Sequence, residues 1–428
     1  VSLDALNGLL YGLSVAFEFH NLGLLLAGCL LGTLVGVLPG LGPVGAISIL
    51  LPLTFQLPPA GAIIMLAGIY NGAMYGGSTT SILINVPGEA ASAVTCLDGY
   101  AMARKGRAGT ALGIAVFGSF IAGTVGLIGL QLIGGPLSVL ALKFGPPEYF
   151  AIILMGFTFI VYLAQGSMIK AVLMALAGIL LSLIGLDPIT SEQRFTFGNI
   201  HLFEGLSVVP LAIGLFGLAE VFVNLEKTAP ARVLQVKIKN MFPNKSQWLR
   251  ARWAIVRGTV IGFFMGILPG GGPVLSTFMA YGVEKRVSKH PEKFGHGAIE
   301  GVAAPESANN AAASTSFIPL MTLGIPPNVV LAVLFGAFMI HGVTPGPLLM
   351  TQHPEIFWGV IASMYMGNVS LLILNLPLIP LWVQVLRIPD KILYQLIVLF
   401  CLLGASSYHN PSPIPILPCR SPTMCRFS

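Results

Sequence analysis

The chain has 428 residues, of which 55% are hydrophobic and only 9% are Asp, Glu, Lys or Arg, and its net charge is +6. A soluble domain carries about 25% charged residues, so this composition excludes an ordinary water-facing surface. Much of the basic excess falls within residues 227–257, which is typical of a cytoplasmic loop of a membrane protein rather than of a nucleic-acid-binding surface.

Long apolar stretches with few or no charges follow one another along the chain, and a bilayer span needs about 20 such residues. They predict an all-α polytopic membrane protein. The stretches are 21–38, 110–133, 149–164, 170–186, 206–223 and 358–383. With 51 Gly and 31 Pro, many helices are expected to be broken, and broken helices are tolerated only where backbone is buried in protein or lines a cavity. This favours a transporter or channel over a simple membrane anchor.

Two stretches of the chain share one pattern, GxxxGxLPGxGPV, at residues 32–44 and 262–274, an offset of 230. A second pair follows, in which residues 77–81 lead to Pro87 and Gly88, and residues 313–316 lead to Gly324 and Pro326. Internal repeats are typical of secondary transporters. The sequence therefore predicts a first transmembrane repeat at 1–225, a basic cytoplasmic connecting loop at 226–257 and a second repeat at 258–404.

Charge also predicts how the repeats are oriented. The basic residues between 104 and 107 and those of 227–257 flank four predicted spans, so both groups are expected in the cytoplasm and the acidic loop 187–204 outside. The second copy of the motif is entered from the basic residues 250–257, whereas no Lys or Arg precedes Arg104 at the entry to the first. Opposite charge at equivalent positions predicts inverted repeats with broken helices or re-entrant hairpins.

The two LPGxGP segments are candidate substrate sites. Pro stops a helix and Gly permits the positive φ that reverses the chain, so the freed amides would face a cavity and attract an anion. The alternative is a tight turn between two complete spans. The candidate substrate-binding glycines are Gly40, Gly42, Gly270 and Gly272.

Hydroxyl-rich and amide-rich stretches follow each motif and could bind a carboxylate or a cation. The further substrate candidates are Ser78, Thr79, Asn85, Asn310, Ser314 and Thr315. The candidates for cation coupling are Thr80, Ser81, Ser316, Glu89 and Glu306. A carboxylate within a membrane costs about 2.5–3.5 kcal/mol on insertion scales, which makes it a functional candidate by default. The alternatives are hydrogen bonding between helices for Ser and Thr, and an interfacial position for the two glutamates.

Residues 1–103 and 294–386, which contain the first LPGxGP segment and both hydroxyl-rich stretches, contain no Lys or Arg. An anionic substrate would therefore need a bound cation, Na⁺ or H⁺, to balance its charge. No zinc, serine-hydrolase or ATP-binding motif occurs, so neither an enzyme nor a primary pump is expected, and no metal or other cofactor is predicted. A passive anion channel and a membrane-embedded enzyme remain as alternatives.

These motifs, together with residues 70–78, 82–88 and 305–310, resemble those of the large membrane subunit of tripartite tricarboxylate transporters, over roughly residues 20–404. The resemblance implies uptake of citrate or a related carboxylate across the bacterial inner membrane, driven by a cation gradient. It also implies two partners, a small membrane subunit and a periplasmic solute-binding protein.

Two expectations concern segments outside the repeats. After Gly404 the apolar pattern gives way to prolines, and the second half is shorter than the first, so residues 405–428 are expected to be an aberrant tail, as a frameshift or truncation would produce. A genuine Pro-rich tail is the alternative. Near the other end, Gly12 is expected to tolerate a β-branched replacement far better than Gly40 or Gly270.

Overall fold

The computed structural model describes residues 2–38, 42–163, 167–187, 192–199, 241–385 and parts of 202–215. These residues are almost entirely helical, and their one strand pair, β1 (Gly185–Leu186) with β2 (Gln193–Arg194), is antiparallel. The helices of the first part are α1 (Ser2–Ala16), α2 (Phe19–Val37), α3 (Gly42–Leu50), η1 (Leu51–Thr54), α4 (Pro59–Ile84), η2 (Ala90–Ser92), α5 (Ala93–Thr95), η3 (Cys96–Tyr100), α6 (Ala101–Arg104), α7 (Ala108–Ala141), α8 (Pro146–Leu163) and α9 (Met168–Ser182). Those of the second part are α12 (Lys245–Ile267), α13 (Gly272–Val287), η6 (Pro291–Lys293), α14 (Glu300–Thr315), α15 (Phe317–Leu323), α16 (Val329–Ile340), α17 (Leu349–Gln352), α18 (Pro354–Asn375) and α19 (Ile379–Val385).

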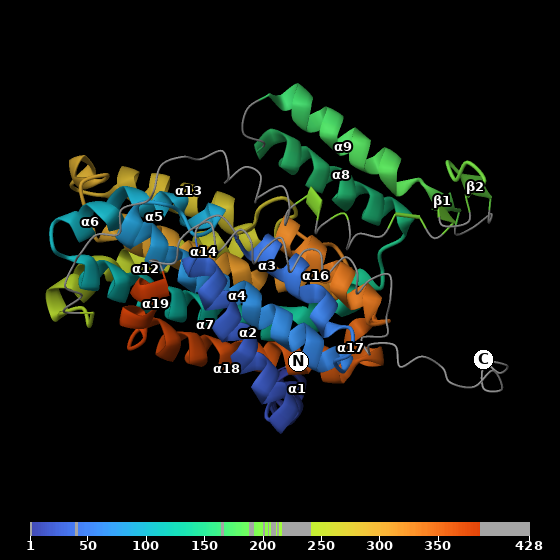
Figure 1. Cartoon of the computed structure of the whole chain (residues 1–428), viewed down its shortest axis with the longest axis horizontal. Coiled ribbons are helices and arrows are strands. Elements are labelled where there is room, and N and C mark those ends of the chain that lie inside the picture. The colour runs from blue at the N-terminus through green and yellow to red at the C-terminus, as the bar shows by residue number, and fades with distance from the viewer. Residues whose placement is uncertain are drawn as a thin grey trace, which may run out of the picture.

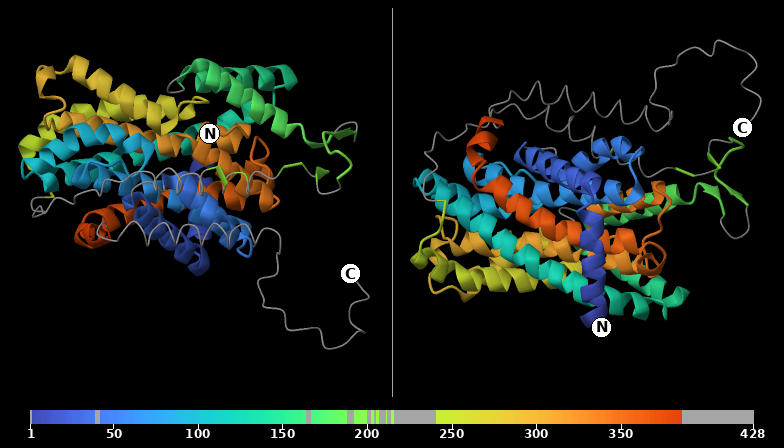
Figure 2. Two further views of the ribbon diagram at one scale, coloured as in Figure 1. Left: turned by 45° about the horizontal axis from the view of Figure 1, so that its top comes forward. Right: turned by 90° about the horizontal axis from the view of Figure 1, so that it is seen from below.

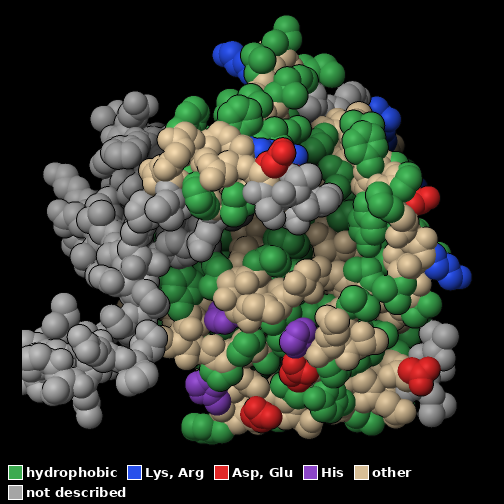
Figure 3. All heavy atoms as spheres, turned by 90° about the vertical axis from the view of Figure 1, so that its right-hand side faces the viewer, with side chains coloured by type: hydrophobic (Ala, Val, Ile, Leu, Met, Phe, Trp, Pro, Cys, Tyr) green, Lys and Arg blue, Asp and Glu red, His purple; other side chains and the backbone are tan. Residues whose placement is uncertain are grey.

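The predicted all-α membrane class is confirmed. Three of the described helices, α2, α7 and α18, are long and apolar enough to cross a bilayer by length and composition. Hydrophobic side chains also cover much of the outer surface and far outnumber charged ones on the face in Figure 3. Phe19, for example, is 94% exposed. Such a surface fits lipid rather than water.

The helices form one bundle with a separate hairpin at its side. In Figure 1, α2, α4, α7 and α18 run together with α12 and α14, while α8 and α9 form a hairpin beside them. Figure 2 shows the same arrangement from two other directions. No residue of α9 is buried. Most of the predicted span 206–223 and the whole of the predicted tail 405–428 lie outside the described residues.

Both LPGxGP segments interrupt a helix, as predicted. Helix α2 ends at Val37 and α3 begins at Gly42, while α12 ends at Ile267 and α13 begins at Gly272. Gly42 and Gly272 have φ values of 58° and 75°, which a residue with a Cβ adopts only at a cost. The chain therefore breaks at the same motif position in both copies.

The predicted connecting loop at 226–257 is wrong at its C-terminal end. Residues 245–257 belong to helix α12, which begins with a reciprocal cap: the Gln247 amide donates to Asn244 Oδ1 at 2.9 Å, and the Asn244 amide donates to Gln247 Oε1 at 2.8 Å. Further along, Arg257 binds Glu284 of α13 through two hydrogen bonds of 2.7 Å. The cap and the ion pair of Arg257 with Glu284 stabilise this helix, which contains the basic residues. Residues 226–240 lie outside the described part of the chain.

The expectation for Gly12 is also wrong. Helix α1 packs against α18 so closely that a Cβ on Gly12 would collide with the backbone carbonyl of Trp358. Gly8, one turn earlier, lies against the Trp358 ring in the same way. The N-terminal helix is thus part of the packed bundle, and its glycines allow that packing.

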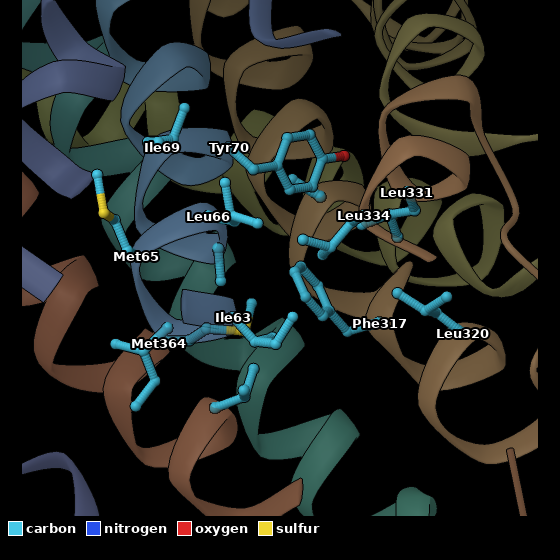
Figure 4. Packing of buried hydrophobic residues seen from close by; sticks show 14 of the residues in the cluster. Ile63, Met65, Leu66, Ile69, Tyr70, Phe317, Leu320, Leu331, Leu334 and Met364 are labelled. Atoms are coloured by element: carbon cyan, nitrogen blue, oxygen red, sulfur yellow. The ribbon is translucent and has the colours of Figure 1, made fainter. Parts of the chain in front are cut away.

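An apolar core joins the two halves of the chain. Figure 4 shows Leu66 and Tyr70 of α4 facing Phe317 of α15 and Leu334 of α16. The Tyr70 and Phe317 ring centroids are 6.1 Å apart, and all four side chains are completely buried. Helices α4 and α14–α15 therefore meet in the centre of the bundle, where several of the predicted site residues lie.

Candidate functional site

Glycines bring two helix pairs into direct backbone contact. Three glycines of α2 face backbone carbonyls of α4, and three of α12 face backbone carbonyls of α14. The contacts are Gly28 with Met65, Gly32 with Ile69, Gly36 with Ala73, Gly258 with Ala304, Gly262 with Ala308 and Gly266 with Ala312. The glycines of the two sets are 230 positions apart and the carbonyl residues 239 apart. The same close packing therefore occurs twice, with contacts every four residues in both helix pairs, which favours the predicted duplication.

The spacing of 239 continues past the ends of these helices. Asn85 ends α4 with φ 58°, and Gly324 ends α15 with φ 71°. Glu89 and Asn328 then cap η2 and α16 with nearly equal backbone angles, φ −147° and ψ 162° against φ −149° and ψ 168°. This register pairs Gly77 with Ser316, whereas the sequence match had paired residues 77–81 with 313–316. The glycine–carbonyl contacts fix the alignment of α4 with α14–α15. This alignment differs from the pairing of the two Ser-Thr stretches that the sequence had suggested.

Residues of one half bind residues of the other in a reciprocal manner. Asn309 Nδ2 donates to Glu89 Oε1 at 3.1 Å. At the equivalent position, the Asn328 side chain lies beside the Tyr70 hydroxyl, which has no partner within hydrogen-bonding geometry in the described part of the chain. Tyr70 corresponds to Asn309 and Glu89 corresponds to Asn328 at the spacing of 239. The contact of Asn309 with Glu89 and the contact of Tyr70 with Asn328 are therefore equivalent. Asn309 Oδ1 is likewise buried, and none of the described residues donates a hydrogen bond to it.

Helix α4 and the segment α14–α15 run antiparallel through this contact. Tyr70 meets Phe317, and Ser78, two turns further along α4, meets Glu306, which is earlier in the chain. Equivalent helices that cross antiparallel are related by a two-fold axis perpendicular to them. If both span the bilayer, that axis lies in the membrane plane, as inverted repeats require.

Two buried carboxylates lie near this crossing. Glu306 is 1% exposed and accepts hydrogen bonds from the hydroxyls of Ser78 and Thr95. Glu89 is 6% exposed and accepts from the Ala91 amide at 2.6 Å and from Asn309. In the described part of the chain, no Lys, Arg or His forms an ion pair with either carboxylate. Buried negative charge without a positive partner is costly, so a carboxylate in this setting is a candidate to bind a cation or a proton.

Several predicted site residues surround the same crossing. Ser81 donates to Ser92 at 2.9 Å, and Thr80 donates to the Val37 carbonyl at 2.7 Å. Ser316 accepts from Asn328 at 3.3 Å. The broken segment of the second half is also close, since the Gly270 amide donates to the Pro327 carbonyl at 2.9 Å and Gly272 faces Asn328.

Other predicted residues face elsewhere. Asn310 donates to Ser119 of α7 at 2.6 Å, Ser314 packs against Gly126 of α7, and Thr315 donates to the Ala311 carbonyl at 3.0 Å. These contacts are those expected of residues that hold helices together. Thr79 is buried and Asn85 is exposed. Gly40 lies outside the described residues.

Thr95 and Asn328 were not among the site residues predicted from the sequence. Thr95 reaches Glu306 because the chain after α4 turns back through the short helices η2 and α5, which no local pattern announces. Asn328 could have been found, since it lies 239 residues after Glu89 and precedes an apolar run as an N-cap residue does.

A third buried carboxylate joins the halves at another point. Asp98 of η3 is completely buried and accepts from the amides of Gly295, Gly297 and Ala298 at 2.7–3.0 Å and from the Tyr281 hydroxyl at 2.9 Å. Gly295 and Gly297 both have positive φ, so the three amides turn toward one point, an arrangement that binds anions. Asp98 thereby fixes the chain just before α14.

Comparison with known proteins gives matches over most of the chain. A family model described as the tripartite tricarboxylate transporter TctA family matches residues 22–416. An uncharacterized 52.8 kDa protein in the TAR-I ttuC' 3' region of Agrobacterium vitis is 52% identical over 414 residues, which are 97% of this chain and 82% of that protein. An uncharacterized protein in the TAR-II ttuC' 3' region of the same organism is 60% identical over 149 residues, 35% of this chain and 62% of that protein. No solved structure matches the chain.

Proposed function

The chain belongs to the tripartite tricarboxylate transporter TctA family, and we propose that it carries out secondary active uptake of citrate or a related carboxylate across the bacterial inner membrane. In this proposal a cation, Na⁺ or H⁺, moves with the substrate. A periplasmic solute-binding protein delivers the carboxylate, and a small membrane subunit completes the transporter.

The observation that carries the proposal is the crossing of α4 with α14–α15. It combines broken helices, unpartnered polar atoms and two buried carboxylates that no described cationic side chain balances. A fixed positive charge would suit a purely electrostatic anion site, whereas excess buried negative charge suits a site that takes a cation together with its anionic substrate. This favours cation-coupled transport over passive anion conduction.

Uptake of labelled carboxylates into proteoliposomes tests this function. We expect saturable uptake of a tricarboxylate or dicarboxylate when both partner subunits are supplied, and we expect imposed inward Na⁺ or H⁺ gradients to stimulate it. Uptake that ignores both gradients would exclude coupling, and no uptake of any member of the panel would exclude a carboxylate substrate.

We further propose that the two halves are inverted copies. Support comes from the reciprocal contacts and from the antiparallel crossing of equivalent helices. Reporter fusions after Glu18 and Asn244, the residues that precede α2 and α12, should then report opposite sides of the membrane. A fusion after Arg104 should report the cytoplasm and serves as the reference. Fusions at Glu18 and Asn244 that report the same side would show that the repeats are parallel.

A further inference from the structure

Glu306 contacts Ser78 and Thr95 of the first half, and the equivalent residues of the two halves are apolar. At the spacing of 239, Ser78 corresponds to Phe317, Thr95 to Leu334, and Glu306 to Ala67. These three counterparts are completely buried and belong to one apolar cluster, part of which is visible in Figure 4. The same crossing of helices is thus built twice, once around a carboxylate and once without a polar side chain at any of the three positions.

Glu89 differs from Glu306 in this respect. Its counterpart is Asn328, and both residues cap the following helix by accepting a backbone amide, from Ala91 and from Leu331. A neutral side chain therefore performs the same task in the other half. Negative charge is not required of a residue in this position, and the bond to Asn309 can be made by an amide oxygen as well.

Glu306 has no capping task, and its carboxylate accepts from side chains alone, the hydroxyls of Ser78 and Thr95. A hydroxyl both donates and accepts, so the two groups can donate to the carboxylate and can also turn their lone pairs toward a cation beside it. Two carboxylate oxygens and two hydroxyl oxygens form the type of oxygen ligand set that a hard cation prefers. Cation binding would also remove the cost of an unbalanced buried charge.

From these features we infer that Glu306, Ser78 and Thr95 bind one monovalent coupling cation, Na⁺ or a proton, and that Glu89 does not bind it. The apolar counterpart provides no second site of this kind among the described residues, so we expect this site to bind one cation. The inference rests on the proposed cation-coupled function, but it concerns binding that occurs without any carboxylate substrate.

Binding of radioactive Na⁺ to the purified full-length chain, without substrate, tests whether the coupling cation is Na⁺. We expect saturable binding of one Na⁺ per chain. Glu306→Gln should abolish it, and Ser78→Ala and Thr95→Val should each weaken it roughly 10-fold, the low end of the effect of altering a supporting ligand. Glu89→Gln should change the affinity less than about 3-fold, because the amide keeps the cap and the bond to Asn309.

Infrared difference spectra recorded across a pH titration test whether the coupling cation is a proton. If the cation is a proton, the chain shows no Na⁺ binding, and a protonated carboxyl band appears on acidification. The component of this band that belongs to the site should be absent in Glu306→Gln and present in Glu89→Gln. The inference is overturned if Glu306→Gln retains the binding or the band, if Glu89→Gln loses either, or if the chain binds neither Na⁺ nor a proton at a carboxylate.

Two controls distinguish loss of cation binding in Glu306→Gln from loss of the fold. Gel filtration and thermal unfolding of Glu306→Gln exclude loss of the fold, and Glu306→Asp should restore part of the binding. A chain that binds the cation through Glu306 but takes up no carboxylate would disprove the proposed function and leave the site intact. Carboxylate uptake with unchanged cation coupling in Glu306→Gln would disprove the cation site and leave the proposed function intact.

Discussion

Gly32→Ile and Gly262→Ile should each abolish recovery of folded protein. A Cβ at position 32 would overlap the Ile69 carbonyl, and one at position 262 the Ala308 carbonyl. Both obstacles are helix backbone, which cannot rotate away as a side chain can, so each pair of helices would have to separate. Overpacking a core costs roughly 1–3 kcal/mol when side chains can adjust, and backbone overlap should exceed that range. The measurement is the yield of monodisperse protein in mild detergent.

Gly23→Ile is the matched control for this experiment. Gly23 lies on the same helix as Gly32, and a Cβ there would meet no atom within 4 Å. Gly282 of α13 is equally open and provides the control for the second half. Both control variants should be recovered at the level of the unmodified chain. Normal yields of Gly32→Ile and Gly262→Ile would contradict the close helix contacts described above.

Asp98→Ala should cause the next largest loss of stability. The substitution leaves the amides of Gly295, Gly297 and Ala298 and the Tyr281 hydroxyl without their common acceptor. Each buried polar group left unsatisfied costs about 1–3 kcal/mol, so the total should be several kcal/mol. Thermal unfolding followed by fluorescence-detected gel filtration measures this as a large fall in the unfolding temperature.

Asp98→Asn provides a graded comparison, because it keeps one acceptor oxygen and loses the charge. It should fall between the unmodified chain and Asp98→Ala. Glu292→Ala, in the turn η6 close by, removes a carboxylate whose side chain is 67% exposed and should have little effect. Equal unfolding temperatures for Asp98→Ala and Glu292→Ala would show that the amides do not depend on Asp98.

The sequence predicted the class of the fold and both helix breaks, because composition and the LPGxGP motif act locally. It did not predict the central helices α4 and α14 as spans. Helix α4 contains several Gly, Ser, Thr and Tyr residues and α14 is rich in Ala, Ser and Asn, since protein rather than lipid surrounds them, and hydropathy detects lipid-facing helices more readily. Helix α14, which carries Glu306, is therefore not among the helices that hydropathy identifies as spans.

Some residues of the crossing were singled out from the sequence, and their roles stay predictions. Ser78 was identified as a substrate candidate, and Glu89 and Glu306 as candidates for cation coupling, because hydroxyls and carboxylates are rare in apolar surroundings. Their partners were not, because the bond from Thr95 to Glu306 joins residues 211 positions apart. The assignment of Asn310, Ser314 and Thr315 to substrate stays a prediction, although all three have contacts typical of helix packing.

Counterflow in proteoliposomes tests the central claim, that the chain is the carrier subunit of a carboxylate transporter, most directly. Vesicles that contain the assembled transporter are loaded with unlabelled carboxylate and diluted into a trace of labelled carboxylate. A carrier whose site faces one side at a time should accumulate the label transiently above its external concentration. Label that only equilibrates, at a rate unaffected by the internal substrate, would identify a channel and contradict the account.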